Sequence, residues 1–474
     1  MKPVTEKFQE IASSTMKDSK VQANLNALYE GFHTRRIEAG SATHNWEYLR
    51  DHGRAIRQHT VDNLDLYIQI LEEAVTANGG SFYLADDADE AARYVVELAK
   101  SRNVKTVIKS KSMLSEEMSL NSKLEENGVE PVETDLGEYI IQLADETPFH
   151  IIAPAMHKDT SDVSDLFHEK LGTPKSSDVH ELAGTARSQL REKFFQADMG
   201  VTGANFVVAE TGTVALVSNE GNGRMCTSMP KIHVAVTGME KIVPTMNELS
   251  TLLRLLIRSA TGQWISSYVT TVSGPRSLND EDGPEEFHLV LVDNGRSRLL
   301  ADPDLREALL CVRCGACMNA CPVYRKVGGH SYGWVYPGPI GAIVSPVLTD
   351  LKQAKDLPFA SSLCGACHEA CPVKINIPRM LLHLRRKLSE GDNDANSQSS
   401  SIAERIFMRG FSIVAGNPLL MGFSMRFFRM IFSPFSKNGK VNKLPGLLSG
   451  WTEYRTFPLP ARVTFRRLWK LKNR

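Results

Sequence analysis

The chain has 474 residues, enough for two or three domains, and its hydrophobic content of 42% and charged content of 23% are ordinary for a soluble globular protein. Its net charge is zero, yet residues 401–474 carry 14 Lys and Arg against 2 Asp and Glu. A basic tail on an acidic body suggests docking to something anionic, and we expect no nucleic-acid partner. The longest uncharged stretch that could be considered a membrane span, Gly410 to Met425, is shorter than the ~20 residues that a membrane-spanning helix needs. No signal peptide is visible.

Residues 1–77 are predicted to form a helical arm. They are polar with helical spacing, and His and Arg side chains gather between Asn45 and His59. A solvated helical surface explains this run better than a ligand-binding site, because charged helix faces usually point to water.

Residues 78–300 change to short β-branched runs that alternate with helical patterns, the clearest over 88–101 and 248–259. Near-continuous apolar runs are typical of strands buried on both faces, and this alternation favours an α/β domain with a largely parallel sheet. Glu210-Thr211-Gly212 predicts a hairpin, so we expect the sheet to be mixed. The expected strands are Val104–Ile108, His150–Ala153, Phe206–Ala209, Thr213–Val217, Ile232–Val236 and Leu289–Val292.

Polar loops beside these runs are candidates for approaching a small anion, with Arg224 as its charge partner. They are Lys109–Met113, His157-Lys158, Gly200–Asn205 and Asn219–Arg224. Tight turns explain the glycines of the last two equally well. Neither of these two loops matches G-x-G-x-x-G, so dinucleotide binding has no support, and no residue stands out as catalytic.

Seven of the eight cysteines lie in two runs that nearly repeat each other. The first is Cys311-x-x-Cys314-x-x-Cys317-x-x-x-Cys321-Pro322, and the second is Ser361-x-x-Cys364-x-x-Cys367-x-x-x-Cys371-Pro372. This is the ligand run of two-cluster ferredoxins, in which the fourth cysteine of each run binds the other run's cluster. The crossed pattern predicts one cluster on Cys311, Cys314, Cys317 and Cys371, and a second on Cys321, Cys364 and Cys367.

The second cluster has only three cysteines, because a serine stands where the repeat predicts a thiolate. Ser361 is its fourth candidate ligand, although an alkoxide is a poorer ligand than a thiolate. We expect two 4Fe–4S clusters, with 3Fe–4S as the alternative at the second position. Zinc is disfavoured because seven cysteines do not make two four-cysteine sites. Cys226 stands alone and is expected to be a buried or incidental thiol.

The cysteine runs belong to a module of residues 301–390 that we expect to be helical, with helices over 302–310, 350–355 and 378–390. Residues 391–401 form a polar linker, and residues 402–474 form the basic tail. In the tail, apolar residues between Phe423 and Phe432 are interleaved with Arg426 and Arg429. This pattern suits contact with a partner protein, which we favour, or with an anionic membrane.

The whole chain resembles the lactate utilization protein B group of iron–sulfur proteins. The resemblance rests on both cysteine runs and on short motifs spread over nearly all 474 residues. These motifs are Lys109-Ser110-Lys111-Ser112-Met113, His157-Lys158, Gly203–Phe206, Ala209–Thr213, Ser273-Gly274-Pro275, Leu291–Arg296 and Gly450-Trp451-Thr452-Glu453-Tyr454-Arg455.

The resemblance implies a LUD domain, similar in fold to the ribose-5-phosphate isomerase and CoA-transferase group, then an α-helical ferredoxin module and a family-specific tail. It also implies a three-component system for growth on L-lactate, whose other members are a CCG-repeat protein and a small LUD protein. The family's cluster ligands fall on the same seven cysteines, and three cysteines on the second cluster are normal for the family. The CoA-transferase kinship suggests Glu210 or Glu220 as a reactive carboxylate, but no matching signature surrounds them.

Three functional hypotheses follow. The favoured one is an iron–sulfur electron-transfer component of a complex that oxidises L-lactate to pyruvate, in the cytoplasm or peripheral at the inner face of the membrane. The alternative is a subunit that itself binds or converts a hydroxy or oxo acid, at the cluster beside Ser361 or in the LUD domain. A purely structural role for the clusters is the least favoured.

Overall fold

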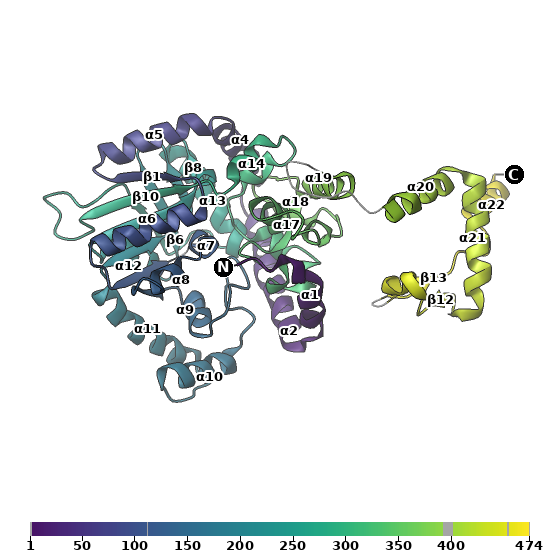
Figure 1. Cartoon of the computed structure of the whole chain (residues 1–474), viewed down its shortest axis with the longest axis horizontal. Helices are drawn as coiled ribbons and strands as arrows, with labels where there is room; N and C mark the ends of the chain where they lie inside the picture. Colours follow the sequence, from purple (N-terminus) through teal and green to yellow (C-terminus); the bar gives the residue numbers. More distant parts are fainter. Residues whose placement is uncertain (1, 111, 392–401, 453–454, 474) are drawn as a thin grey trace. The chain divides into compact units, whose positions relative to one another are not determined.

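The computed structural model describes residues 2–110, 112–391, 402–452 and 455–473 (Figure 1). It divides into two compact units, residues 1–398 and 399–474, which are described separately. Lys111, most of the expected linker, Glu453 and Tyr454 lie outside the described residues.

The larger unit is built on a six-stranded sheet in the order β1-β10-β7-β4-β2-β3, and every adjacent pair is parallel. The expected largely parallel sheet is therefore confirmed, although Gly200–Thr202, expected in a loop, belong to a strand. The strands are β1 (Ser81–Ala85), β2 (Thr106–Ser110), β3 (Glu130–Glu133), β4 (Met199–Thr202), β7 (Ile232–Gly238) and β10 (Glu286–Val292).

The expected hairpin lies in a second sheet, whose order is β8-β5-β6-β9. β5 (Phe206–Val208) and β6 (Thr213–Ser218) pair antiparallel, and so do β6 and β9 (Tyr268–Val272), while β8 (Ile242–Val243) pairs parallel to β5. This smaller sheet is the mixed one.

The six-stranded sheet is apolar on both faces, as its continuous apolar strands predict. Val234 and Val290 face a core shared with α6 (Ala88–Ser101) and α8 (Leu120–Glu125). Their neighbours Ala235 and Leu289 face a core shared with the second sheet and α5 (Leu64–Ala77). Other helices of this domain are α7 (Met113–Glu117), α9 (Leu136–Leu143), α10 (Thr160–Leu171), α11 (Val179–Gln196), α12 (Asn222–Ser228) and α13 (Met246–Thr261).

His150–Ala153 do not form the expected strand, because these apolar residues pack against the cysteine-rich module instead. The Tyr324 hydroxyl donates to the Phe149 carbonyl at 2.9 Å. A Cβ on Gly329 would lie 1.6 Å from that same oxygen, so only glycine permits this approach. The segment thus joins the two parts of the larger unit.

The N-terminal helices are confirmed, but they are not the solvated arm that their polarity suggested. Arg50 and Arg57 of α4 are almost fully buried against the cysteine-rich module. Figure 1 shows α1 and α2 beside that module, where α1 contacts α16. The helices are α1 (Phe8–Lys17), α2 (Ser19–Leu28), α3 (Thr34–Ser41) and α4 (Trp46–Asp62), with a π-helical turn at Tyr29–His33.

The cysteine-rich module is helical, but two of its expected helices differ. Residues 350–355 form turns, and only Arg306–Leu310 of the first expected helix are helical, as a 3-10 helix. The third prediction is confirmed by α19 (Ile377–Glu390). α14 (Arg296–Ala301) lies at the end of the α/β domain, just before this module. The remaining helices of the module are α15 (Ala316–Asn319), α16 (Tyr324–Val327), α17 (Gly338–Leu348) and α18 (Ala366–Ala370), with 3-10 turns at His330–Tyr332 and Leu357–Phe359.

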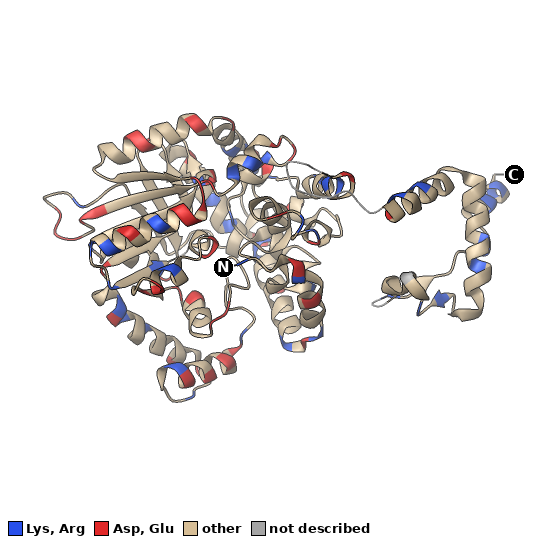
Figure 2. Cartoon of the chain, in the orientation of Figure 1, with Lys and Arg blue, Asp and Glu red and all other residues tan. Residues whose placement is uncertain are grey.

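The smaller unit contains α20 (Ile402–Gly416), α21 (Pro418–Phe432), α22 (Phe465–Lys472) and three two-residue strands, β11 (Ser436–Lys437), β12 (Lys440–Val441) and β13 (Phe457–Pro458). Figure 2 shows Lys and Arg recurring along α21 and α22. Within the described part of the chain, no single helix has the length and apolar composition to cross a membrane. The pair Ile402–Gly416 and Pro418–Phe435 meets that test only when taken together, with a bend of 109° between its members.

Candidate functional site: the cysteine runs and the adjoining pocket

The two cysteine runs repeat in backbone conformation as well as in sequence. The residue before the second cysteine position is left-handed in both, with φ 59° at Arg313 and 56° at Leu363. The glycines after that cysteine, Gly315 and Gly365, are also left-handed, at 74° and 87°. Non-glycine residues adopt this region at some cost, so the repeat of the same turn identifies it as a built feature of both loops.

The thiols form two neighbourhoods that cross between the runs, with Cys317 affected by both. Burial raises the pKa of Cys314 to about 12, and Cys371 and then Cys311 add to this shift. Burial likewise raises the pKa of Cys367 to about 12, and Cys321 and then Cys364 add to it. Each run's last cysteine therefore lies with the other run's thiols.

The cysteine sulfurs of the described residues lack the close spacing of a single-ion site. Tetrahedral zinc with Zn–S bonds of about 2.3 Å would bring the thiolate sulfurs to within about 4 Å of one another. Among the described residues, no cysteine belongs to a group of three or more ligand atoms that lie within 4.8 Å of one another. Backbone N–H groups also point at the sulfurs, as from Tyr324 to Cys321 Sγ at 3.4 Å, which stabilises thiolate charge.

The two neighbourhoods differ in depth. In the first set Cys314, Cys317 and Cys371 are buried and Cys311 is partly buried. In the second set Cys321 and Cys367 are buried and Cys364 is exposed. Ser361 occupies the position that corresponds to Cys311, and the bonding is equivalent. The Ser361 hydroxyl accepts the N–H of Leu363 at 3.1 Å, as the Cys311 sulfur accepts the N–H of Arg313 at 3.4 Å.

Two buried arginines of α4 hold the cysteine runs in place. Arg50 donates through Nη2 to the carbonyls of Cys371 at 2.8 Å and Glu369 at 3.0 Å. Arg57 donates to the carbonyl of Leu309, just before the first run, at 2.9 Å. The same guanidinium donates to the Ile242 carbonyl at 2.6 Å and to the Glu240 carbonyl, so it ties the first run to the segment after β7.

A cavity of ≈ 240 Å³ lies where the cysteine-rich module meets the carboxyl ends of β4 and β7. Carboxyl ends of parallel strands are the usual ligand-binding edge of such sheets. Two of the sequence-predicted loops meet here, since Gly203, Ala204 and Asn205 line the cavity together with Asn219 and Glu220. Of the loop after β2, Ser112 and Met113 line it as well.

The other predicted anion-binding residues do not face this cavity. Lys109 is buried against Glu133, with Nζ–Oε1 2.6 Å, and contacts Asn121. His157 and Lys158 both pair with Glu146 at 2.6 Å. Arg224, expected to be the charge partner of an anion, is exposed on α12 and away from the cavity.

A buried charge network closes the module end of the cavity. Arg296 donates to both oxygens of Glu117, at 2.9 and 3.1 Å, and through Nε to Glu240 at 2.6 Å. The hydroxyl of Tyr336 donates to Glu117 at 2.6 Å. Burial opposes ionisation of Glu240, yet Arg296 and Arg313 lower its pKa to about 2. A Cβ on Gly238 would lie 2.0 Å from a Glu240 side-chain oxygen and 2.4 Å from Arg296 Nε, so a larger residue here would displace this ion pair.

Sequence reasoning missed two cations beside this network, Arg313 and Lys241. Arg313 lies between Cys311 and Cys314, and its Nη2 is 3.3 Å from Glu240 Oε1. Its guanidinium stacks 4.4 Å above the Tyr336 ring. Lys241 also lines the cavity, and burial lowers its pKa to about 8. A comparison of the two cysteine runs could have singled out Arg313, because the first run has a cation where the second has the apolar Leu363.

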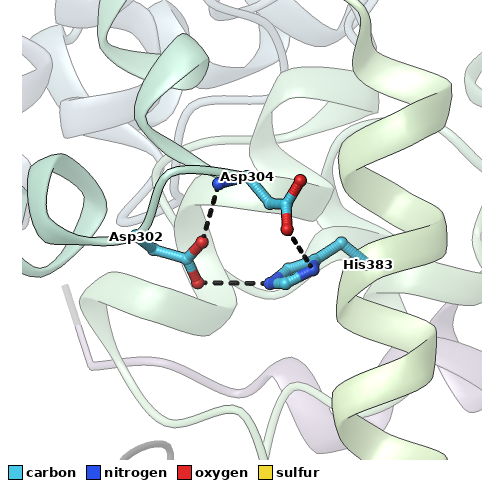
Figure 3. A group of neighbouring side chains, drawn as sticks. All are labelled: Asp302, Asp304 and His383. Atoms are coloured by element: carbon cyan, nitrogen blue, oxygen red, sulfur yellow. Dashed lines mark hydrogen bonds and ion pairs between the residues drawn. The ribbon is translucent and has the colours of Figure 1, made fainter.

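Asp302, Asp304 and His383 form the one group in the described chain that has the ligand spacing of a single-ion site (Figure 3). The ring nitrogens of His383 lie 3.2 Å from each carboxylate, and the Lys387 ammonium is 2.8 Å from Asp302. These cationic and hydrogen-bonding partners already satisfy the carboxylates. The group therefore acts as a clamp that holds α19 to the segment before the first cysteine run.

Comparison with known proteins identifies three consecutive regions. Residues 68–292 match the LUD domain, residues 307–375 the 4Fe-4S dicluster domain, and residues 387–474 the C-terminal region of lactate utilisation protein B. The lactate utilization protein B of Bacillus cytotoxicus is 47% identical over 99% of this chain and 98% of its own length. That of Bacillus velezensis is 45% identical over the same shares. A DUF162 family crystal structure from Deinococcus radiodurans matches at 13% identity with a TM-score of 0.27, over 48% of this chain and 98% of its own.

Proposed function

Because this chain belongs to the lactate utilization protein B family, we propose that it is the iron–sulfur electron carrier of a multi-component lactate-utilization system. In this proposal it receives electrons as L-lactate is oxidised to pyruvate. The partners are a CCG-repeat protein and a small LUD protein. The proposal explains why the cysteine runs adjoin a cavity of the LUD domain.

The seven cysteines would hold two clusters, and their positions fit such groups. Cys311, Cys314, Cys317 and Cys371 would hold the first, and Cys321, Cys364 and Cys367 the second, with Ser361 at its fourth corner. The crossed thiol neighbourhoods and the N–H groups directed at sulfur support this division. Iron–sulfur clusters supply one-electron transfer at potentials set by charge, hydrogen bonds and exposure.

The single observation that carries the proposal is that the first set of cysteines adjoins the cavity, whereas one member of the second set, Cys364, is exposed. The first set adjoins the cavity through Arg313, whereas the second reaches the surface at Cys364. This order gives the chain an inner end for receiving electrons and an outer end for delivering them. Purely structural clusters would not need one end at a cavity and the other at the surface.

We propose that the C-terminal unit docks a partner protein. In this unit Phe423, Phe427 and Met430 of α21 are exposed beside the cations of the same helix. Flotation with anionic liposomes at physiological salt tests the alternative. Protein that stays with the soluble fraction supports protein docking, and protein that floats indicates a membrane surface.

The electron-carrier proposal is tested by anaerobic reconstitution. Holo-protein is mixed with the two partner components, and its paramagnetic resonance spectrum is followed after L-lactate is added. We expect signals of reduced clusters that depend on L-lactate and on both partners. Clusters that dithionite reduces but L-lactate with the partners does not would overturn the proposal.

A second candidate function is favoured by the cavity itself. The chain would bind a hydroxy or oxo acid directly in the LUD domain, next to the first cysteine run. The alternative in which the acid binds at Ser361 has weaker support, because the cavity is lined by Arg313 of the first run and not by Ser361. Acid binding and electron transfer are compatible functions, since a hydroxy acid bound in this cavity would lie beside the first cysteine run.

A further inference from the structure

We propose that Arg313 and Lys241 form a carboxylate-binding subsite for a small 2-hydroxy or 2-oxo acid in the cavity between the LUD domain and the first cysteine run. The class of acid rests on the proposed function. The presence of a carboxylate site rests on the geometry alone.

The Arg313 guanidinium has partners in the chain on two sides but none at Nη1. Nη2 pairs with Glu240 at 3.3 Å, and the plane of the guanidinium rests on the Tyr336 ring. Nη1 is fully buried and has no hydrogen-bond partner in the described chain. A buried, charged N–H group without an acceptor is unfavourable, so its position beside a cavity points to an acceptor supplied by a ligand.

The charge at this end of the cavity is also unbalanced. Glu117 and Glu240 face Arg296 and Arg313, and Arg57 and Lys241 are two further buried cations. Glu240 attracts Lys241, but no carboxylate of the described chain forms an ion pair with it. One carboxylate bound between Arg313 and Lys241 would offset part of this excess of positive charge, and a guanidinium is well suited to bind it through two hydrogen bonds.

The rest of the cavity suits a small ligand with a short apolar substituent. Ile152 and Leu256 give it apolar walls, and Asp135, Glu138 and Glu220 also line it. These carboxylates disfavour a dicarboxylate ligand, because a second negative charge would lie among them. A volume of ≈ 240 Å³ is below the range for drug-sized ligands, which favours an acid of few carbons.

The turn that carries Arg313 does not itself require arginine. Leu363 adopts the same left-handed conformation in the second run and does not line this cavity. The choice of side chain is therefore independent of the cysteine loop's geometry. Arg313→Leu gives the first run the residue of the second, so it removes the cation and keeps a residue that this turn accommodates.

The test is calorimetric titration of anaerobic holo-protein with pyruvate, and with pyruvamide as a neutral analogue. We expect saturable binding of pyruvate and much weaker binding of pyruvamide. Arg313→Leu and Lys241→Met should each weaken pyruvate binding by about tenfold to a hundredfold with iron content unchanged. Arg224→Leu is the matched control, because it removes an exposed arginine outside the cavity, and its affinity should equal that of the wild type.

Unchanged affinity in Lys241→Met, which lies outside the cysteine runs, would overturn the subsite even if Arg313→Leu lost its iron. So would the absence of binding to the wild type, or equal affinity for pyruvate and pyruvamide. The outcome is separable from the electron-carrier proposal. Pyruvate binding without lactate-dependent reduction would leave the subsite standing and remove the proposed function, and reduction without binding would do the reverse.

Discussion

Replacing Arg296 by methionine should strongly destabilise the LUD domain. The Arg296 side chain is 2% exposed and pairs with Glu117 and Glu240, whose side chains are 0% and 3% exposed. Removing one partner of a buried ion pair typically costs about 3–5 kcal/mol, because the remaining charge is left uncompensated. Glu117 keeps the Tyr336 hydroxyl and Glu240 keeps Arg313, so we expect the middle of that range, about 4 kcal/mol.

Anaerobic thermal unfolding of the holo-protein measures this loss. At roughly 2–4 °C per kcal/mol for a domain of this size, Arg296→Met should lower Tm by about 10 °C. Arg298→Met is the matched control, since Arg298 is exposed on the same helix and should shift Tm by less than about 2 °C. Adding Glu117→Gln to Arg296→Met should recover part of the loss. A Tm for Arg296→Met within about 2 °C of the wild type would refute the reasoning about this network.

Two further predictions follow from the thiols and from a buried histidine. In paramagnetic resonance spectra, Cys321→Ala should alter the same cluster signals as Cys364→Ala. The signals that Cys314→Ala alters should be unchanged in Cys321→Ala. A Cys321→Ala spectrum like that of Cys314→Ala would contradict the crossed ligation. Burial lowers the pKa of His233 to about 3, so below pH 6.5 the unfolded chain binds a proton that the folded chain does not. The free energy of unfolding should therefore decrease as the pH is lowered, by about 2 kcal/mol at pH 5. In His233→Gln the difference in Tm between pH 7 and pH 5 should be smaller.

Much of the α/β domain was predictable because its signals are local. The apolar runs at Ile232–Val236 and Leu289–Val292 lie within β7 and β10, and α6 begins and ends where the pattern indicated. His150–Ala153 has a strand-like composition as well. It forms no strand because its neighbours Phe149 and Gly329 dock it on the cysteine-rich module, a contact between segments about 180 residues apart.

The site was predictable only in its metal-binding half. Cysteine spacing identifies a cluster-binding loop because ligands close in sequence must converge on one group. The cavity depends instead on Glu240, Arg296 and Arg313, which come from three separate segments. Nothing in the sequence near Arg313 indicates that its guanidinium would stack on Tyr336, and polar patterning alone placed the buried Arg50 and Arg57 on a solvated surface.

The central claim is that electrons enter at the cavity side and leave at the exposed second set of cysteines. It is tested most directly by L-lactate-driven reduction of the Cys364→Ala variant in the system reconstituted with its partners. The account predicts that the signal assigned to Cys311, Cys314, Cys317 and Cys371 still appears upon addition of L-lactate, while electron delivery to an added acceptor is lost. If that signal fails to appear although dithionite produces it, or if delivery continues at the wild-type rate, the proposed order of electron transfer is wrong.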